Sequence, residues 1–168
     1  MLAACLLFFA LTVDAQNKPQ LSDPEIASVA VVANQIDINA GELAKSKSKN
    51  SDVTNFANTM INDHQSVINQ ATALVKKLNV TPKDNTVSKK LLADAANTEK
   101  ILSSKSGKAF DKAYTDNEVA YHEAVISTVK DVLIPEAQNA ELKQLLQNVL
   151  PALQTHLEHA QMIQKKLE

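Results

Sequence analysis

The sequence predicts an all-α protein: a four-helix bundle of two helical hairpins, joined by a long crossover that holds one short extra helix. Composition is the first reason, because only 4% of the 168 residues are aromatic and two are glycines. A β-sandwich needs many turn glycines and aromatic strand residues. Periodicity is the second reason, since apolar residues recur at alternating spacings of three and four, as in bundle helices. A chain of this length forms one domain with a sizeable core.

The first long helix should start after Ser22 and end near Lys49. Ser22 supplies a capping side chain, Pro24 suits the first turn, and Glu25 places a carboxylate near the positive end of the helix dipole. The apolar seam of this helix comprises Ile26, Val29, Ala33, Ile36, Ala40 and Leu43. Residues 50–52 form a short turn and cap the second helix. Its seam comprises Val53, Phe56, Met60, Val67, Ala71, Leu74 and Leu78.

Residues 79–85 break the helical pattern, and residues 87–104 form a weaker helix that we expect to be a surface connector. The third long helix should run over residues 108–133. We expect it to end there because Pro135 disfavours a helical conformation in the residue before it.

The fourth helix should begin near Asn139, and Pro151 inside it is expected to kink the helix or to split off its first turns. Its seam comprises Leu142, Leu146, Val149, Leu153, His156, Ala160, Ile163 and Leu167. About thirty residues connect the two hairpins. One long crossover between the second and third helices is the ferritin-like arrangement.

The N-terminal residues read as an export signal. Residues 1–15 contain an apolar run of signal-peptide length and end in a small-x-small pattern, so we expect cleavage after Ala15. A charged n-region is missing, and we expect the natural start to lie upstream. Cys5, the only cysteine, also resembles a lipidation site, although its apolar run follows it. Residues 16–21 then form a linker, and residues 22–168 form the bundle of a protein exported to the periplasm or the outer membrane.

Four polar residues are expected to meet inside the bundle: Asp37, His64, His122 and His156. Residues equidistant from a tight helical turn lie at equal height. The midpoint of Asp37 and His64 falls in the first turn, and that of His122 and His156 falls at Asn139. At about 1.5 Å of rise per residue, small errors leave the side chains within reach.

This layer suits one transition-metal ion. Imidazoles with a carboxylate bind zinc, copper, iron or nickel, and manganese is a further candidate. Asp63, Tyr114 and Glu118 could support the ligands or add to them, Glu118 because it lies one turn before His122. His159 is expected to be a bystander. The alternative is a purely structural layer, since networks of buried polar side chains also fix the register of bundles.

Other functions find little support. The net charge is −2 and no dense basic stripe occurs, so a nucleic-acid partner is not expected. The sequence has no glycine-rich phosphate loop, and no spacing supports a Ser-His-Asp arrangement. Protein partners other than an envelope association or a second copy of the chain are not indicated.

Four separated motifs resemble a known bacterial family. They are residues 38–44 (INAGELA), Phe56-Ala57 followed by residues 60–64 (MINDH), residues 110–114 (FDKAY) ahead of His122, and residues 150–153 (LPAL) ahead of His156. In this order they resemble the family called domain of unknown function 4142, described as exported, ferritin-like and often outer-membrane proteins. The resemblance covers residues 24–167 and implies no established activity.

The family's characteristic positions fall here on Asp63, His64, Tyr114, His122, Pro151 and His156. Asp37 stands where an acidic residue, often glutamate, is expected. Di-iron bundles carry Glu-x-x-His on two helices, whereas Glu118 and His122 are four apart, which argues against ferroxidase activity. The leading hypothesis is therefore an envelope protein that binds a metal. The alternatives are a structural or interaction module and a mononuclear-metal oxidoreductase.

Overall fold

The computed structural model describes residues 20–168, and every described element is helical. The elements are α1 (Asp23–Lys47), α2 (Ser51–Lys77), α3 (Thr86–Ser103), α4 (Gly107–Thr128), the π-helical turn η1 (Val129–Leu133), α5 (Ile134–Glu136) and α6 (Ala140–Leu167). The all-α class is confirmed. The predicted export signal lies outside the described residues. From residue 20 onward, none of the helices combines the length and hydropathy needed to span a membrane.

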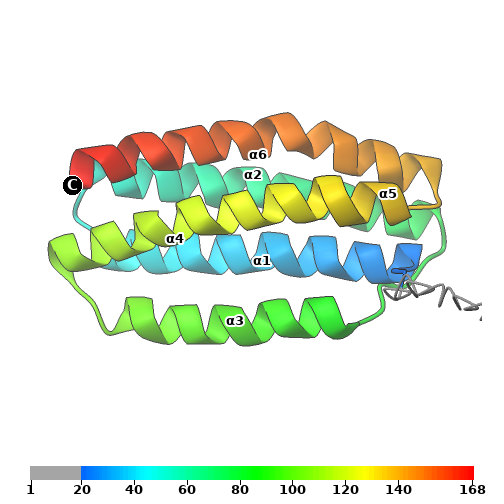
Figure 1. The fold of residues 1–168 in the computed structure, drawn as a ribbon, viewed down its shortest axis with the longest axis horizontal. Coiled ribbons are helices and arrows are strands. Elements are labelled where there is room, and N and C mark those ends of the chain that lie inside the picture. The colour runs from blue at the N-terminus through cyan, green and yellow to red at the C-terminus, as the bar shows by residue number, and fades with distance from the viewer. Residues whose placement is uncertain (1–19) are drawn as a thin grey trace, which may run out of the picture.

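Two antiparallel hairpins, α1–α2 and α4–α6, form the bundle, and α3 lies alongside α1 (Figure 1). Local sequence explains the start of α1: the Ser22 backbone N–H donates to Glu25 Oε2 at 3.0 Å, a capping contact that fixes the first turn. At its other end, Ser48 Oγ donates to the buried Asp111 Oδ1 at 2.5 Å and links α1 to α4.

The third long helix does not end at Leu133, as the sequence predicted. It passes through η1 and one further turn, α5, before the chain turns extended at Ala137. The N–H of Ile134 donates to the carbonyl of Val129, five residues back. Pro135 has no N–H to donate, which deprives a carbonyl of the preceding turn of its α-helical partner and favours such a local rearrangement.

Pro151 does not split the last helix, because α6 is continuous from Ala140 to Leu167. Figure 1 shows α6 bowed outward along its length. The Oγ1 of Thr155 donates to the Pro151 carbonyl at 3.0 Å. The prediction that the first turns separate from the helix is therefore wrong, and the helix is bent but not broken.

The hydrophobic core has two parts, one on each side of a polar layer. One cluster lies toward the α5 end and contains Ile26, Val29, Ile126, Leu133, Leu142, Leu146 and Leu153. The other lies toward the opposite end and contains Val53, Phe56, Met60, Phe110, Tyr114, Ala160 and Ile163. The predicted site residues fall between these clusters.

Candidate metal centre

Each long helix contributes one buried side chain to the layer: Asp37 from α1, His64 from α2, His122 from α4 and His156 from α6. Their exposed fractions are 1%, 4%, 0% and 5%. The ring centroids of His64 and His122 lie 5.8 Å apart, those of His64 and His156 5.3 Å, and those of His122 and His156 5.5 Å. The structure thus brings all four predicted residues together.

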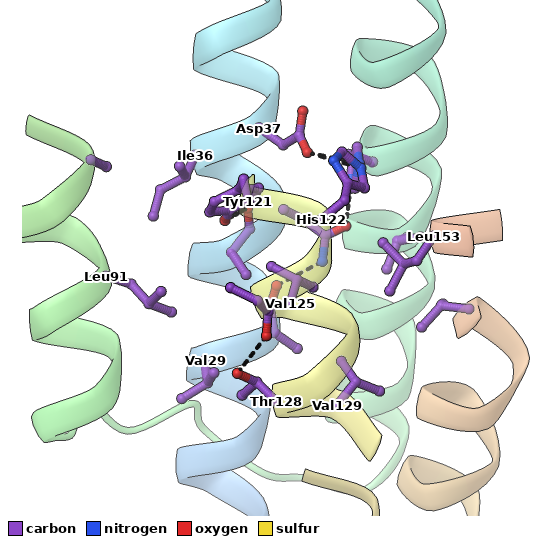
Figure 2. A pocket seen from close by; sticks show the side chains of 18 of the residues that line it. Val29, Ile36, Asp37, Leu91, Tyr121, His122, Val125, Thr128, Val129 and Leu153 are labelled. Carbon is purple, nitrogen blue, oxygen red and sulfur yellow. Dashed lines mark hydrogen bonds and ion pairs between the residues drawn. The ribbon is translucent and has the colours of Figure 1, made fainter. Parts of the chain in front are cut away.

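Asp37 points toward the imidazoles, as Figure 2 shows. Its Oδ2 lies 3.1 Å from His64 Nε2 and 3.5 Å from His122 Nε2. The close approach of α1 and α2 at Gly41, one turn after Asp37, helps to set this geometry, because a Cβ there would lie 2.9 Å from Ile61 Cγ1.

The outer nitrogen of His64 is held by a short hydrogen-bond chain. Asn34 Nδ2 donates to the Ala30 carbonyl at 2.7 Å, which turns Asn34 Oδ1 toward His64 Nδ1, also at 2.7 Å. Because that oxygen only accepts, the proton must sit on Nδ1 of His64. The other ring nitrogen, Nε2, faces the interior and Asp37.

The other two histidines are arranged in the same way. His122 Nδ1 donates to the Glu118 carbonyl at 2.9 Å, and His156 Nε2 donates to Asp63 Oδ2 at 2.9 Å. The opposite nitrogens, Nε2 of His122 and Nδ1 of His156, then carry lone pairs. Hydrogen bonds of this kind, to a carbonyl or a carboxylate, orient histidines that bind metals.

The inner atoms have no hydrogen-bond partner within the described residues. They are both oxygens of Asp37, Nε2 of His64 and His122, and Nδ1 of His156. An unpaired buried polar atom costs about 1–3 kcal/mol, so a cluster of five is costly. Two acceptors 3.1 Å apart, as in Asp37 and His64, require a proton or a metal cation between them.

Glu118 and Tyr114 extend the layer toward the Phe110 end of α4. Glu118 is 1% exposed, and its Oε2 and the Tyr114 hydroxyl also lack partners among the described residues. Burial and the charge of Asp37 hold the pKa of Glu118 well above its ordinary value, which favours the neutral acid. Asp37, Glu118 and His122 could by themselves hold an ion, as could the three histidines.

The electrostatics keep the ligand groups in metal-binding forms. Burial lowers the pKa values of His122 and His156, so both rings are favoured as neutral imidazoles. Burial raises the pKa of Asp37, but the adjacent histidines, His64 first, outweigh it and leave that pKa below its ordinary value. A carboxylate beside neutral imidazoles is the protonation state that a metal ion needs.

Sequence reasoning missed Asn34, although its position three residues before Asp37 on the same helix face was a usable signal. The structure places Asp63 behind His156, where its side chain is half exposed. The hydroxyl of Tyr121 donates to the Ala33 carbonyl at 2.8 Å and is not free for the site. His159 packs edge-on against Phe56, with ring centroids 5.2 Å apart, outside the layer.

Fold and site together define a helical bundle with a buried His/Asp cluster that could hold a metal ion. A family model described as a domain of unknown function (DUF4142) matches residues 9–163, and the chain belongs to this family. No curated protein and no solved structure gives a significant match to the chain.

Proposed function

We propose that this protein is an exported ferritin-like bundle whose function is to bind one transition-metal ion through Asp37, His64, His122 and His156. One observation carries the proposal. Each histidine has its outer nitrogen engaged by a hydrogen bond, while its inner nitrogen is buried, close to the other two rings and without a hydrogen-bond partner in residues 20–168. This supports a ligand set oriented in advance.

The alternative, a layer that only fixes the packing, fits these contacts less well. A structural polar network joins donors to acceptors, and buried groups are normally satisfied. Here Oδ2 of Asp37 faces Nε2 of both His64 and His122, so two imidazole nitrogens share one carboxylate oxygen. A metal cation would satisfy all of them at once, whereas a single proton satisfies one pair.

Three nitrogen ligands and one oxygen ligand are the donor set of zinc, copper and iron sites, whereas manganese prefers sites richer in oxygen. Two-iron chemistry has less support, because Glu118 and His122 do not form the Glu-x-x-His pair of di-iron bundles and α6 has none. We therefore favour a mononuclear site. The proposed periplasmic or outer-membrane location rests on residues 1–15.

The test is elemental analysis of protein purified without an affinity tag, followed by thermal unfolding with zinc, copper, iron or manganese salts. A metal at a hundredfold excess over its Kd stabilises by about 2.7 kcal/mol. For a domain of this size that corresponds to a rise in Tm of roughly 5–11 °C. His64→Gln should lose the metal and this rise.

His159→Gln is the matched control, because His159 lies on the same helix as His156 but outside the layer. It should keep both the metal and the stabilisation. Protein that contains no metal and gains no stability from any of the four salts would show that the layer is structural.

A further inference from the structure

A cavity of about 820 Å³ adjoins the His/Asp layer. It lies between the two hairpins and α3, and Figure 2 shows Asp37 and His122 among the side chains that line it. Below them Val29, Val125 and Leu153 project from three different helices. Its volume lies in the range of small-molecule sites, which are mostly apolar with a few polar groups that fix orientation.

The cavity extends from the layer toward the α5 end of the bundle, and along α1 it also continues past Asp37 to Leu43 in the other direction. The wall begins at Asp63 on α2 and at Asn117 on α4. From the layer onward it runs from His64 to Val75 along α2, and from His122 to Leu133 along α4 and η1, eleven residues in each case. At about 1.5 Å per residue this is a length of roughly 16 Å. This stretch is long and has the buried His/Asp layer at its start, which matches a molecule with one head group and one extended chain.

The wall of this stretch is mostly apolar, and its polar members include Gln70, Thr128 and Asn148. Ala71 and Leu74 face it from α2, Val129 and Leu133 from η1, and Leu146 and Val149 from α6. An apolar space of this kind disfavours water, since water needs polar partners. It would favour alkyl groups in proportion to the apolar area that they bury.

The charges of the lining select the head group. Within residues 20–168, none of the lining residues is a lysine or an arginine. Besides Asp37, the acidic lining residues are the half-exposed Asp63 near the layer and Asp94 and Glu99 on the exposed rim of α3. With Glu118 as the neutral acid that its burial favours, a divalent ion held by the Asp37 carboxylate and three neutral imidazoles retains one net positive charge. Such a charge is costly to bury without a partner. An anionic head group on the metal would neutralise it.

We propose that the cavity binds a straight-chain fatty carboxylate, with its alkyl chain along the apolar wall and its carboxylate on the metal ion at the His/Asp layer. This inference rests on the proposed metal site. The metal is the cation that the head group needs, so binding should require the metal, and it should require the chain as well as the carboxylate.

The experiment is a calorimetric titration of the full chain with dodecanoate, with and without the bound metal, after gel filtration has removed excess metal. The metal-loaded protein should bind one dodecanoate, whereas acetate, which has the head group without the chain, should bind at least about tenfold more weakly. Dodecanoate should likewise lose at least about tenfold in affinity when the metal is removed.

Two variants fill the cavity without touching the metal ligands. Ala71→Leu acts two turns from His64 on the same helix face, and Ala30→Leu acts from α1, in case the first variant folds poorly. Either should retain the metal and bind dodecanoate at least about tenfold more weakly. Ala73→Leu is the matched control, because Ala73 is exposed on α2 outside the cavity, and it should bind as the wild type does.

The outcomes separate the two proposals. Metal-loaded protein that does not bind dodecanoate, or that binds it equally well in Ala71→Leu and Ala30→Leu, overturns the fatty-carboxylate site and leaves the metal site standing. Equal affinity with and without metal overturns the assignment of the head group to the metal. Protein that takes up no metal overturns the proposed function and this inference together.

Discussion

Gly41 brings α1 close enough to α2 to place Asp37 beside His64, and replacing it should perturb both stability and the site. A Cβ at this position would lie 2.9 Å from Ile61 Cγ1 and 3.1 Å from the Ala57 carbonyl oxygen. Favourable contacts between carbon atoms occur at about 3.5–4.0 Å. The helices must therefore separate by several tenths of an ångström, because the Ala57 oxygen belongs to the backbone and cannot rotate away.

The expected effect of Gly41→Ala is a net destabilisation of about 1–2 kcal/mol. Overpacking a tight contact costs about 1–3 kcal/mol, and we place this site in the upper part of that range because one neighbour is backbone. Replacing glycine by alanine inside a helix stabilises the helix by about 1 kcal/mol, which offsets part of this cost. At roughly 2–4 °C per kcal/mol for a domain of this size, Tm should fall by roughly 2–8 °C.

Thermal and urea unfolding of a double-mutant cycle with Ile61→Ala measures this contact. Removing Ile61 Cγ1 relieves the closer of the two overlaps, so Gly41→Ala should cost less in that background, with a coupling of about 0.5–3 kcal/mol. If Gly41→Ala raised Tm equally in both backgrounds, helix propensity alone would decide the outcome. The close contact between α1 and α2 would then make no measurable contribution to the free energy of unfolding, and our reasoning would be refuted.

Three further predictions concern single contacts. Asp63→Ala removes the acceptor of His156 Nε2 and should lower metal affinity about 10–100-fold in a chelator competition, with Asp63→Asn closer to wild type. Ser48→Ala leaves the buried Asp111 without this partner and should destabilise by about 1–3 kcal/mol in urea. The hydrogen bond from Ser22 lowers the pKa of Glu25, so its stabilisation is present above its ordinary pKa of 4.5 and is lost as pH falls through the lower folded value. In thermal unfolding measured over a series of pH values, Glu25→Gln should make Tm depend less on pH in this acidic range.

The helical pattern could be predicted because it is local. Apolar spacing and caps depend on neighbours in the chain, and the observed start of α1 and end of α2 lie within one or two residues of those expected. The sequence also predicted that Asp37 and His64 lie at the same height in the bundle, because residues at equal distance from a tight turn lie level. The end of the third helix could not be predicted from the sequence. It depends on a π-helical turn, which forms according to the hydrogen-bond partners that the carbonyl groups around Pro135 find.

The tautomers of the site could not be predicted from the sequence. Whether a histidine offers Nε2 or Nδ1 depends on what its other nitrogen meets, and those partners come from other helices for His64 and His156. Asp63 could be predicted as a possible supporting residue, but its partner could not, because the hydrogen bond from His156 depends on the α2–α6 contact. The sequence predicted that Glu118 lies next to His122, because the two residues are four apart on one helix. It did not predict that Glu118 is completely buried.

The sequence by itself determined which helices form and which four polar residues share one height, because both depend on short-range periodicity and on turn position. Only the tertiary structure decided which atoms face inward, how closely α1 approaches α2 at Gly41, and that a cavity adjoins the layer. Those properties depend on side chains from helices far apart in the chain. Close packing and buried hydrogen bonding are settled only when all of those helices meet.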